Sequence, residues 1–380
     1  MTAPAQILPP AMLGVLGGGQ LGRFFVIAAR QMGYRVTVLD PDAGSPAGAI
    51  ADRHLVAAYD DAKALDALAA DCVAITTEFE NVPAESLARL SRSRRVAPAP
   101  ECVAISQDRI REKAAFAAHG LPVGPCAAVT TAADLDRPEL YPAVLKRARF
   151  GYDGKGQARV ASPAEARAAF EGFGRVPCVL ERRLALDCEV SVIVARGADG
   201  ASACYDPAEN RHRHGILDVS IVPARIPAAL AREAQDMAAS LAAALGYVGV
   251  LGVEFFVSGE RLLVNEIAPR PHNSGHHTMD ACATSQYQQQ VRALCGLPLG
   301  DARLLTPAVM VNVLGDAWPE SGEPDWGAVL AEPRAKLHLY GKAEARPGRK
   351  MAHITVLDAD PAKALEAALA LRARLGIGDD

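Results

Sequence analysis

Short apolar runs alternate with longer amphipathic runs along the first hundred residues of this chain. Residues 12–16 form an apolar run, a glycine-rich turn follows, and residues 20–33 carry apolar side chains at helical spacing. A second apolar run at residues 35–39 continues the alternation, which extends to about residue 90. Strands and helices in regular alternation favour a parallel sheet covered by helices. Gly33 is expected to end the first helix.

The pattern changes after residue 143, where strand-like runs dominate as far as residue 271. Helical spacing interrupts these runs at residues 163–170 and 228–246. The mixture is typical of an α+β fold whose sheets are largely antiparallel. From Pro307 onward the sequence predicts three more strands and one helix, a section short for a domain that folds alone.

Composition narrows the class of protein. A length of 380 residues suggests two or three compact units, and 50% hydrophobic with 22% charged residues is typical of globular chains. The net charge of -4 argues against nucleic acid, which basic surfaces bind. We expect a cytoplasmic protein, because the sequence has neither a membrane-spanning apolar run nor a secretory signal. The eight cysteines form no C-x-x-C pair, so we expect reduced core residues and no zinc site.

The run G-G-G-Q-L-G at 17–22 follows a predicted strand and opens a predicted helix, with Asp40 ending the next strand. Such a turn offers backbone N–H groups to a phosphate, and it fits a dinucleotide motif. A plain tight turn is the alternative, and nothing later supplies the acid–base residue of a dehydrogenase. Glu78 and Glu80 follow the fourth strand, where they could face a ligand crevice or only solvent.

Two later segments are suited to a nucleotide. Lys146 ends a predicted strand shortly before the loop 151–157, whose three glycines lie among charged residues. This loop could cover a polyphosphate, or it could be an ordinary hairpin turn. Residues 181–184 end another strand and Glu189 opens the next, which suits an adenine ring and a ribose, although glutamates at strand ends are commonly just solvated.

The sharpest local prediction concerns Glu254 and Glu266. They lie on two strands joined through residues 258–260, almost equally far from the turn. Like charges facing each other across an antiparallel pair are destabilising, so two half-buried carboxylates there require a cation. Mg²⁺ fits best, because it prefers oxygen ligands and takes one or two carboxylates beside phosphates. The alternative is a pair of solvated glutamates.

Polar and cationic residues cluster further along. Arg270, His272, Asn273 and Ser274 directly follow the glutamate pair, and substrate or phosphate contact suits them better than zinc. A second group near the end can clamp a substrate phosphate or can simply be a solvated hairpin. Its members are Lys342, Arg346, Arg349 and Lys350.

In this order the segments resemble the ATP-grasp superfamily, and more closely the N5-carboxyaminoimidazole ribonucleotide synthetase family of purine biosynthesis. The resemblance covers about residues 12–357 and rests on G-G-G-Q-L-G, E-F-E-N-V-P, Q-D-R-x-x-E-K, G-Y-D-G-K-G-Q, E-N-R-H-R-x-G-I-L and N-E-I-A-P-R-P-H-N-S-G-H. It implies an α/β N-terminal, Rossmann-like pre-ATP-grasp domain (1–104), an ATP-grasp domain of two α+β lobes (105–300) and a small C-terminal α+β piece (301–380).

The implied enzyme is an ATP-dependent carbon–nitrogen ligase that uses ATP and Mg²⁺. It joins bicarbonate to the amine of 5-aminoimidazole ribonucleotide through carboxyphosphate, giving ADP and phosphate, and the family resemblance also suggests a homodimer. The main alternative is a formate-dependent glycinamide ribonucleotide transformylase, in which other residues stand at positions 20 and 273. An NAD-dependent oxidoreductase and a nucleotide-binding regulator without catalysis are the alternatives from other classes.

The resemblance also implies roles for individual residues. Glu254 and Glu266 would hold the metal. The nucleotide would meet Arg109, Lys146, Gly151, Tyr152, Asp153, Gly154, Lys155, Gly156, Gln157, Glu181, Arg182, Arg183, Leu184, Glu189, His212, Asn265 and Glu266. The ribonucleotide would meet Gly19, Gln20, Leu21, Glu78, Glu80, His272, Asn273, Ser274, Lys342, Arg349 and Lys350. Catalysis would fall to Glu78, Tyr152, Asp153, Lys155, His272 and Asn273.

Phe150, His214 and Ala352 depart from the family pattern, and none of them removes a charged or metal-binding group.

Overall fold

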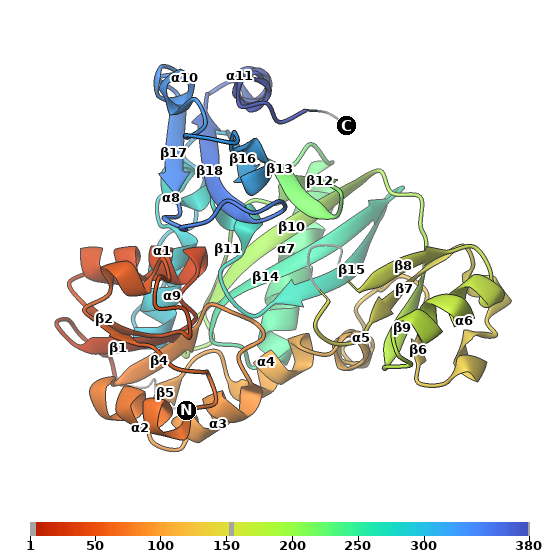
Figure 1. Ribbon diagram of the computed structural model, residues 1–380, viewed down its shortest axis with the longest axis horizontal. Helices are drawn as coiled ribbons and strands as arrows, with labels where there is room; N and C mark the ends of the chain where they lie inside the picture. Colours follow the sequence, from red (N-terminus) through yellow and green to blue (C-terminus); the bar gives the residue numbers. More distant parts are fainter. Residues whose placement is uncertain (1–4, 152–155, 379–380) are drawn as a thin grey trace.

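The computed structural model describes residues 5–151 and 156–378, which form three parts around a central sheet (Figure 1). The first part is a five-stranded parallel sheet. Its strands are β1 (Met12–Leu16), β2 (Arg35–Leu39), β3 (Arg53–Leu55), β4 (Ala74–Thr77) and β5 (Arg95–Val96), in the order β3-β2-β1-β4-β5. The helices here are α1 (Gln20–Gln31), α2 (Ala62–Asp71), α3 (Ala84–Ser91) and α4 (Pro100–Ser106). This is the parallel sheet that the alternating pattern predicts.

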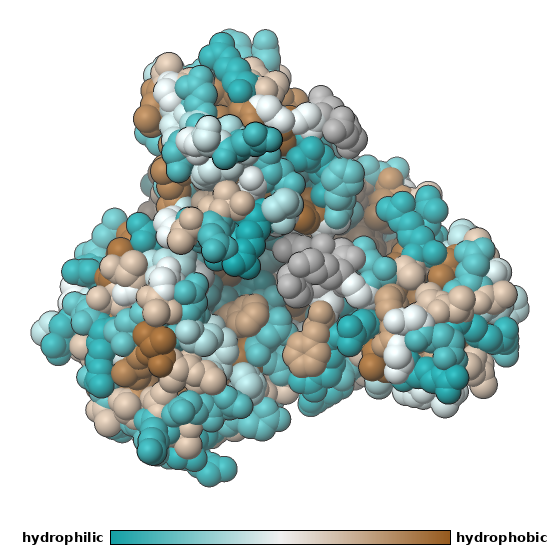
Figure 2. Space-filling view, viewed as in Figure 1, coloured by the Kyte–Doolittle hydropathy of each residue, from teal (hydrophilic) through white to brown (hydrophobic). Residues whose placement is uncertain are grey.

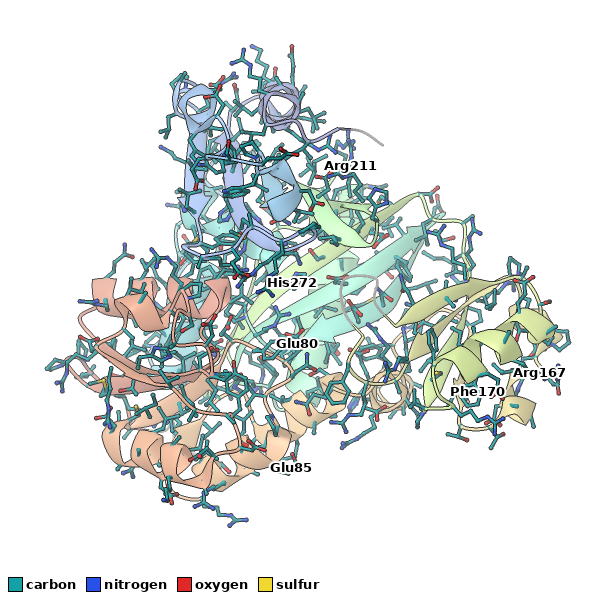
Figure 3. All side chains as sticks on the ribbon, in the orientation of Figure 1. Glu80, Glu85, Arg167, Phe170, Arg211 and His272 are labelled. Carbon is teal, nitrogen blue, oxygen red and sulfur yellow. The ribbon has the colours of Figure 1, made fainter. Side chains whose placement is uncertain are left out.

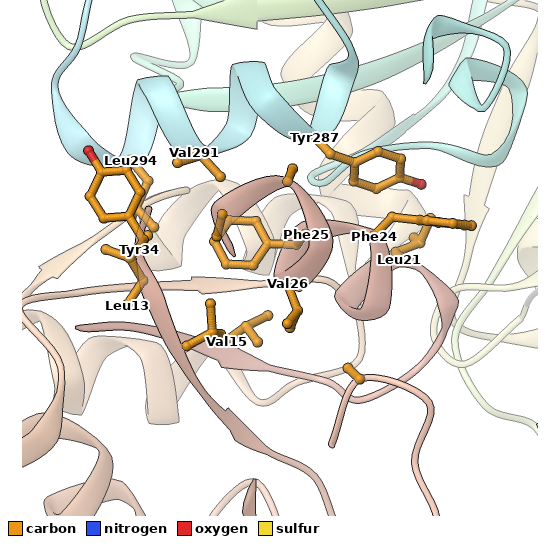
Figure 4. Close-up of a cluster of buried hydrophobic side chains, with 14 of the residues drawn as sticks. Leu13, Val15, Leu21, Phe24, Phe25, Val26, Tyr34, Tyr287, Val291 and Leu294 are labelled. Atoms are coloured by element: carbon orange, nitrogen blue, oxygen red, sulfur yellow. The ribbon is translucent and has the colours of Figure 1, made fainter. Parts of the chain in front are cut away.

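Helix α1 links this first part to the rest of the molecule. It begins after Gly19 and ends at Gln31, and Gly33 follows with a φ of 86°, as expected for a helix stop. Its apolar face packs against α9 (Gln286–Cys295), and Figure 4 shows Phe24 and Phe25 beneath the side chains of that helix. The ring centroids of Phe24 and Tyr287 lie 5.3 Å apart. The helix that follows the glycine turn is therefore held against the large domain.

A small antiparallel sheet forms the second part. It contains β6 (Cys126–Val129), β7 (Ala143–Arg147), β8 (Gln157–Val160) and β9 (Cys178–Arg182), in the order β6-β9-β7-β8. Helix α6 (Pro163–Gly172) buries Phe170 against one face of this sheet, beside Leu145 and Leu180. Alternation along β7 and β9 turns Lys146 and Glu181 to the other face, toward α5 (Arg109–Ala118) and the central sheet.

The central sheet has nine strands. Its path is β15-β14-β10-β12-β13-β16-β18-β17, and β11 pairs with β10. The strands are β10 (Cys188–Arg196), β11 (Ser202–Cys204), β12 (Ala208–Arg213), β13 (Ile216–Val222), β14 (Gly249–Ser258), β15 (Arg261–Ala268), β16 (Ala308–Leu314), β17 (Ala335–Leu339) and β18 (Lys350–Leu357). The strands after residue 307 thus continue the sheet of β10, β12 and β13 through the pairing of β13 with β16.

Helices cover this sheet in two places. Helix α7 (Ala228–Ala244) packs on β10 and β14, where it buries Leu241 against Val192 and Val253. Helix α11 (Pro361–Arg374) covers β16 and β18 near the C-terminus. The remaining helices are α8 (Thr278–Ala281), α10 (Trp326–Leu330) and the short 3₁₀ turns η1 (Gly48–Ile50), η2 (Ala132–Leu135), η3 (Pro138–Leu140), η4 (Asn273–Gly275) and η5 (Gly315–Ala317). No described helix is long and apolar enough to span a membrane.

The fold class expected from the sequence is confirmed, and several elements were not predicted. β6 is a run of only four small residues, β12 is mostly polar, β13 carries Asp218 and Ser220 among its apolar residues, and α9 carries four glutamines that hide its apolar face. Three of these glutamines are buried and hydrogen-bonded: Gln286, Gln289 and Gln290. Hydrophobic periodicity cannot detect a helix whose buried face is built from amides.

Candidate active site

The carboxylates of Glu254 and Glu266 are brought together by a bulge in β15. Ser258 pairs with Arg261 and Phe255 with Val264, but Glu254 pairs with Glu266, because Asn265 is an extra residue at this point. A regular hairpin would place Asn265 opposite Glu254 and turn Glu266 toward α7. The bulge lets Asn265 and Glu266 both face the cleft side and returns Ile267 to the core.

Each carboxylate has a separate partner from another segment. Arg109, at the start of α5, donates a hydrogen bond from Nη1 to Oε2 of Glu266 at 2.6 Å. His272 Nε2 lies 3.2 Å from Oε1 of Glu254. Burial and the charge of Glu266 raise the pKa of Glu254, whereas Arg109 and Lys146 outweigh burial and hold the pKa of Glu266 below its usual range. While no cation neutralises the pair, one of two neighbouring carboxyl groups tends to keep its proton and the other stays charged.

The donor set suits Mg²⁺ better than a softer metal. Among the described residues, no group of three or more His, Cys, Asp and Glu side chains could hold a metal ion. Two carboxylates on one hairpin are nevertheless a common protein contribution to a Mg²⁺ site, in which phosphates and water complete the shell. Asn265 adds a buried side-chain oxygen that has no hydrogen-bond partner among the described residues.

Lys146 and Glu181 form a wall on the face of the small sheet that lies toward α5, where the sequence predicts a nucleotide. Lys146 Nζ lies 2.6 Å from Oε2 of Glu181, and Lys113 Nζ lies 3.5 Å from the other oxygen. Lys113 also donates to the backbone oxygen of Asn265 at 2.7 Å, so it joins the small sheet to the glutamate hairpin. The two lysines outweigh burial and lower the pKa of Glu181. Lys113 was not predicted, because a lysine on a helix is usually a solvated residue.

The other predicted nucleotide contacts lie around this wall. Glu189 Oε2 is 3.3 Å from His212 Nδ1, across neighbouring strands. The side chains of Arg182 and Arg183 are exposed and Leu184 is half-buried, so the described geometry leaves mainly their backbone for an adenine. Of the predicted loop, Gly151 accepts a hydrogen bond from Arg109, and Gly156 and Gln157 lead into β8. Tyr152, Asp153, Gly154 and Lys155 lie outside the described residues.

Carboxylates occupy the glycine turn of the first domain. Gly18 N–H donates to Asp40, and the N–H groups of Gly19 and Gly22 donate to the two oxygens of Glu78 at 2.8 and 3.0 Å. Burial raises the pKa of Glu78 to about 7, although these two hydrogen bonds oppose the shift. The sequence suggested a phosphate at this helix N-terminus, but here the side chain of Glu78 occupies that place. Gln20 and Leu21 are the first two residues of α1 and directly follow Gly19.

A second group of predicted substrate residues lies near the centre of the molecule, beside a hollow in its surface. Figure 3 places Glu80 and His272 at the centre of the molecule, and Figure 2 shows the surface hollowed where the three parts meet. Arg270 Nε lies 2.5 Å from Oε2 of Glu80, and it outweighs burial to lower the pKa of that carboxyl. Both side-chain amide atoms of Asn273 are buried without a hydrogen-bond partner among the described residues. An amide with all its groups unsatisfied is suited to a ligand.

The C-terminal cations approach this hollow from the segment that joins β17 to β18 and from the first residue of β18. Lys342 donates to the backbone oxygen of Lys350 at 2.6 Å and lies over the ring of Tyr340. The charge of Lys350 acts on Glu80, Glu254 and His272, so it is electrostatically part of the site. Arg349 is half-buried and donates from Nη1 to the backbone oxygen of Glu344. Lys342 and Lys350 therefore join the site in this conformation, and Arg349 lies at its edge.

Comparisons with known proteins identify the family to which the chain belongs. Family models match at residues 11–107 (ribonucleotide synthetase preATP-grasp domain), 114–287 (ATP-grasp domain) and 308–367 (phosphoribosylaminoimidazole carboxylase C-terminal domain). The N5-carboxyaminoimidazole ribonucleotide synthase of Brucella melitensis is 46% identical over 361 residues, covering 92% of this chain and 97% of the relative. The chain belongs to the N5-carboxyaminoimidazole ribonucleotide synthase family.

Other relatives agree with this family assignment. The Bacillus subtilis N5-carboxyaminoimidazole ribonucleotide synthase is 44% identical over 355 residues, covering 92% of each chain. A solved ADP complex of an N5-carboxyaminoimidazole ribonucleotide synthetase matches with a TM-score of 0.90 and 42% identity, covering 97% of this chain and 98% of that one. The Aspergillus clavatus enzyme in complex with ADP and 5-aminoimidazole ribonucleotide matches with a TM-score of 0.88 and 31% identity, covering 96% and 98%. This chain is therefore an ATP-grasp ligase, as the motifs predict.

Proposed function

We propose that this ligase carboxylates 5-aminoimidazole ribonucleotide at the expense of ATP, in purine biosynthesis. A bicarbonate oxygen attacks the γ-phosphorus, so that ADP leaves and carboxyphosphate forms. The exocyclic amine then attacks the carboxyl carbon, and inorganic phosphate leaves. The observation that carries this proposal is the 46% identity to a synthase of that name over nearly the whole chain. The same name recurs among its relatives and disfavours the formate-dependent transformylase.

The site geometry supports a distribution of roles. Glu254 and Glu266 are proposed to hold Mg²⁺, which when bound would neutralise charge on the phosphates. Arg109 and Lys146 would meet the phosphates, and both are already fixed by glutamate partners. The other nucleotide contacts named above stay predictions, including those in the loop 151–157.

The ribonucleotide is proposed to lie between the first domain and the central sheet. Asn273 supports this placement, because its buried amide offers two donors and an acceptor that have no partner among the described residues. Lys342 and Lys350 would bind the substrate phosphate, with Arg349 closing on it from the edge. Glu78 would act mainly by holding the glycine turn that presents Gln20.

ADP release with each acceptor tests the proposal directly. We expect rapid ADP formation only when 5-aminoimidazole ribonucleotide and bicarbonate are both present. Glycinamide ribonucleotide with formate serves as the matched alternative, and an equal or faster rate with that pair would overturn the assignment. Carbon-13 bicarbonate should appear in the carboxyamino product, which distinguishes carboxylation from a simple stimulated ATPase.

Location and assembly belong to the same proposal. We propose a cytoplasmic homodimer, in which the location rests on the features of the sequence given above and the dimer rests on the family resemblance. Sedimentation equilibrium of the purified chain tests the dimer, because a single species at the mass of one chain would contradict it.

A further inference from the structure

A line of buried polar side chains runs from Glu254 across four strands of the central sheet. We call Ser220, Asn210, Ser191 and Ser274, together with His272, the buried hydrogen-bond network. Their exposed fractions are 0% for Ser220 and Ser274, 1% for Ser191 and 6% for Asn210. Sequence reasoning did not find this network, because scattered serines in strands carry no pattern of their own.

The donor and acceptor atoms of the network show which residue donates each hydrogen bond. Ser220 Oγ donates to Oδ1 of Asn210 at 2.8 Å, and Nδ2 of Asn210 donates to Oγ of Ser191 at 2.9 Å. Because an amide nitrogen can only donate, Ser191 accepts from it and keeps its own proton for another acceptor. The neighbouring acceptor is Oγ of Ser274 at 2.7 Å.

The same logic continues to the imidazole. Ser274, which accepts from Ser191, is left to donate its proton to Nδ1 of His272 at 2.9 Å. An imidazole nitrogen that accepts a hydrogen bond carries no proton, so the proton of the neutral ring is on Nε2. That nitrogen lies 3.2 Å from Oε1 of Glu254. Every hydrogen bond in the network therefore points toward His272, and Nε2 of His272 faces the carboxylate.

The backbone of His272 is fixed independently of its ring. Gln286 accepts from the N–H of His272 at 2.9 Å and donates to its carbonyl at 2.8 Å. With the main chain held by this amide, the remaining freedom is the orientation and tautomer of the ring. Nδ1 accepts from the hydroxyl of Ser274 at 2.9 Å and from the backbone N–H of Ser274 at 3.4 Å, and both contacts favour a proton on Nε2. Ser191 also lies directly opposite Glu254 in the pairing of β10 with β14, so the network and the carboxylate share one register.

We infer that Asn210, Ser191 and Ser274 are positioning residues that hold His272 as the Nε2–H tautomer, so that it donates to Glu254 and orients this carboxylate toward the proposed metal. The amide of Asn210 sets the direction, because it is the member that cannot exchange donor and acceptor roles by rotating a hydroxyl. In this arrangement His272 orients a metal ligand and does not act as a base. The kinetic consequence rests on the proposed function, whereas the tautomer does not.

Nitrogen-15 NMR of histidine-labelled protein reads the tautomer without any substrate. We expect the ligand-free wild-type chain to show His272 protonated at Nε2, with the signal assigned by its loss in His272→Gln. Protonation at Nδ1 would overturn the inference.

Asn210→Asp keeps the shape of the side chain at position 210 and, once ionised, removes its donor. Ser191 would then donate to the new carboxylate, Ser274 would donate to Ser191, and His272 would shift to the Nδ1–H form. The matched control is Ser220→Ala, which removes a network hydroxyl but keeps the Asn210 amide, so the tautomer should not change. Both spectra are recorded up to pH 9 to ionise the new carboxyl, on samples whose circular dichroism shows a folded chain. An unchanged tautomer in folded Asn210→Asp at pH 9 would overturn the inference.

Activity then separates the inference from the proposed function. The Mg²⁺ concentration for half-maximal ADP release should rise about tenfold in Asn210→Asp, the usual scale when a partner of a metal ligand is changed. A switched tautomer with an unchanged Mg²⁺ requirement would overturn the positioning role. Failure of the wild-type chain to form ADP with its acceptor would refute the proposed function and leave the tautomer result standing.

Discussion

Glu254 faces Glu266 across β14 and β15 because Asn265 bulges out of β15 between Val264 and Glu266. The arrangement places two carboxylates on one side of a hairpin whose other side is core. Burial and the neighbouring Glu266 raise the pKa of Glu254, so charging both carboxyl groups costs free energy while no cation is bound.

Glu254→Gln tests this balance between stability and activity. Turnover should fall at least 100-fold, because the proposed metal loses a ligand, while the ligand-free protein should be as stable as wild type or more so, because the like-charged pair is gone. Urea unfolding and ADP release measure the two effects. The control is Glu260→Gln at the exposed turn of the same hairpin, which should change neither. Full activity in Glu254→Gln would rule out the metal assignment.

Lys146→Met tests the nucleotide wall. Without Lys146, the buried carboxylate of Glu181 keeps Lys113 as its ion-pair partner among the described residues, and the proposed phosphate contact is lost. The KM for ATP should rise tenfold or more, whereas the KM for 5-aminoimidazole ribonucleotide should change little. Arg182→Ala is the matched control, because this side chain is exposed and its proposed adenine contact is made by the backbone. A tenfold higher KM for ATP in Arg182→Ala would contradict that placement.

The sequence predicted most of the fold and the broad location of the site. Apolar alternation predicted the parallel sheet, and the positions of Glu254 and Glu266 on either side of one turn predicted that the two carboxylates face each other, because both signals are local. The bulge at Asn265 was not predictable. A strand pattern assumes that residues of two neighbouring strands pair one to one, and a bulge adds a residue that breaks this count. The direction of the buried network was equally hidden, because it depends on which atoms of Asn210 face which strand.

The C-terminal cations provide a test of substrate recognition. Lys342→Met should raise the KM for 5-aminoimidazole ribonucleotide about 10- to 100-fold, the scale of one charge-assisted hydrogen bond to phosphate, with little change in the KM for ATP. Arg346→Met is the control, because Arg346 is exposed and pairs with Glu344 on the same segment. Equal increases in both variants would show that the segment acts only through its overall charge.

Glu78 should make stability depend on pH in an unusual direction. Burial raises the pKa of Glu78 from 4.5 to about 7, so between these values the folded chain binds more protons at this site than the unfolded chain. Its contribution to the free energy of unfolding therefore falls as pH rises from 4.5 to 7, by about 3 kcal/mol at full shift. Urea unfolding of wild type and Glu78→Gln across this range should reveal the slope as a difference between the two proteins. Glu80→Gln supplies the opposite sign, because Arg270 outweighs burial and lowers the pKa of Glu80, whose stabilisation is lost as pH falls. A wild-type advantage over Glu78→Gln that grows from pH 4.5 to 7 would show that the hydrogen bonds from Gly19 and Gly22 outweigh burial, and that Glu78 holds the glycine turn as a full anion.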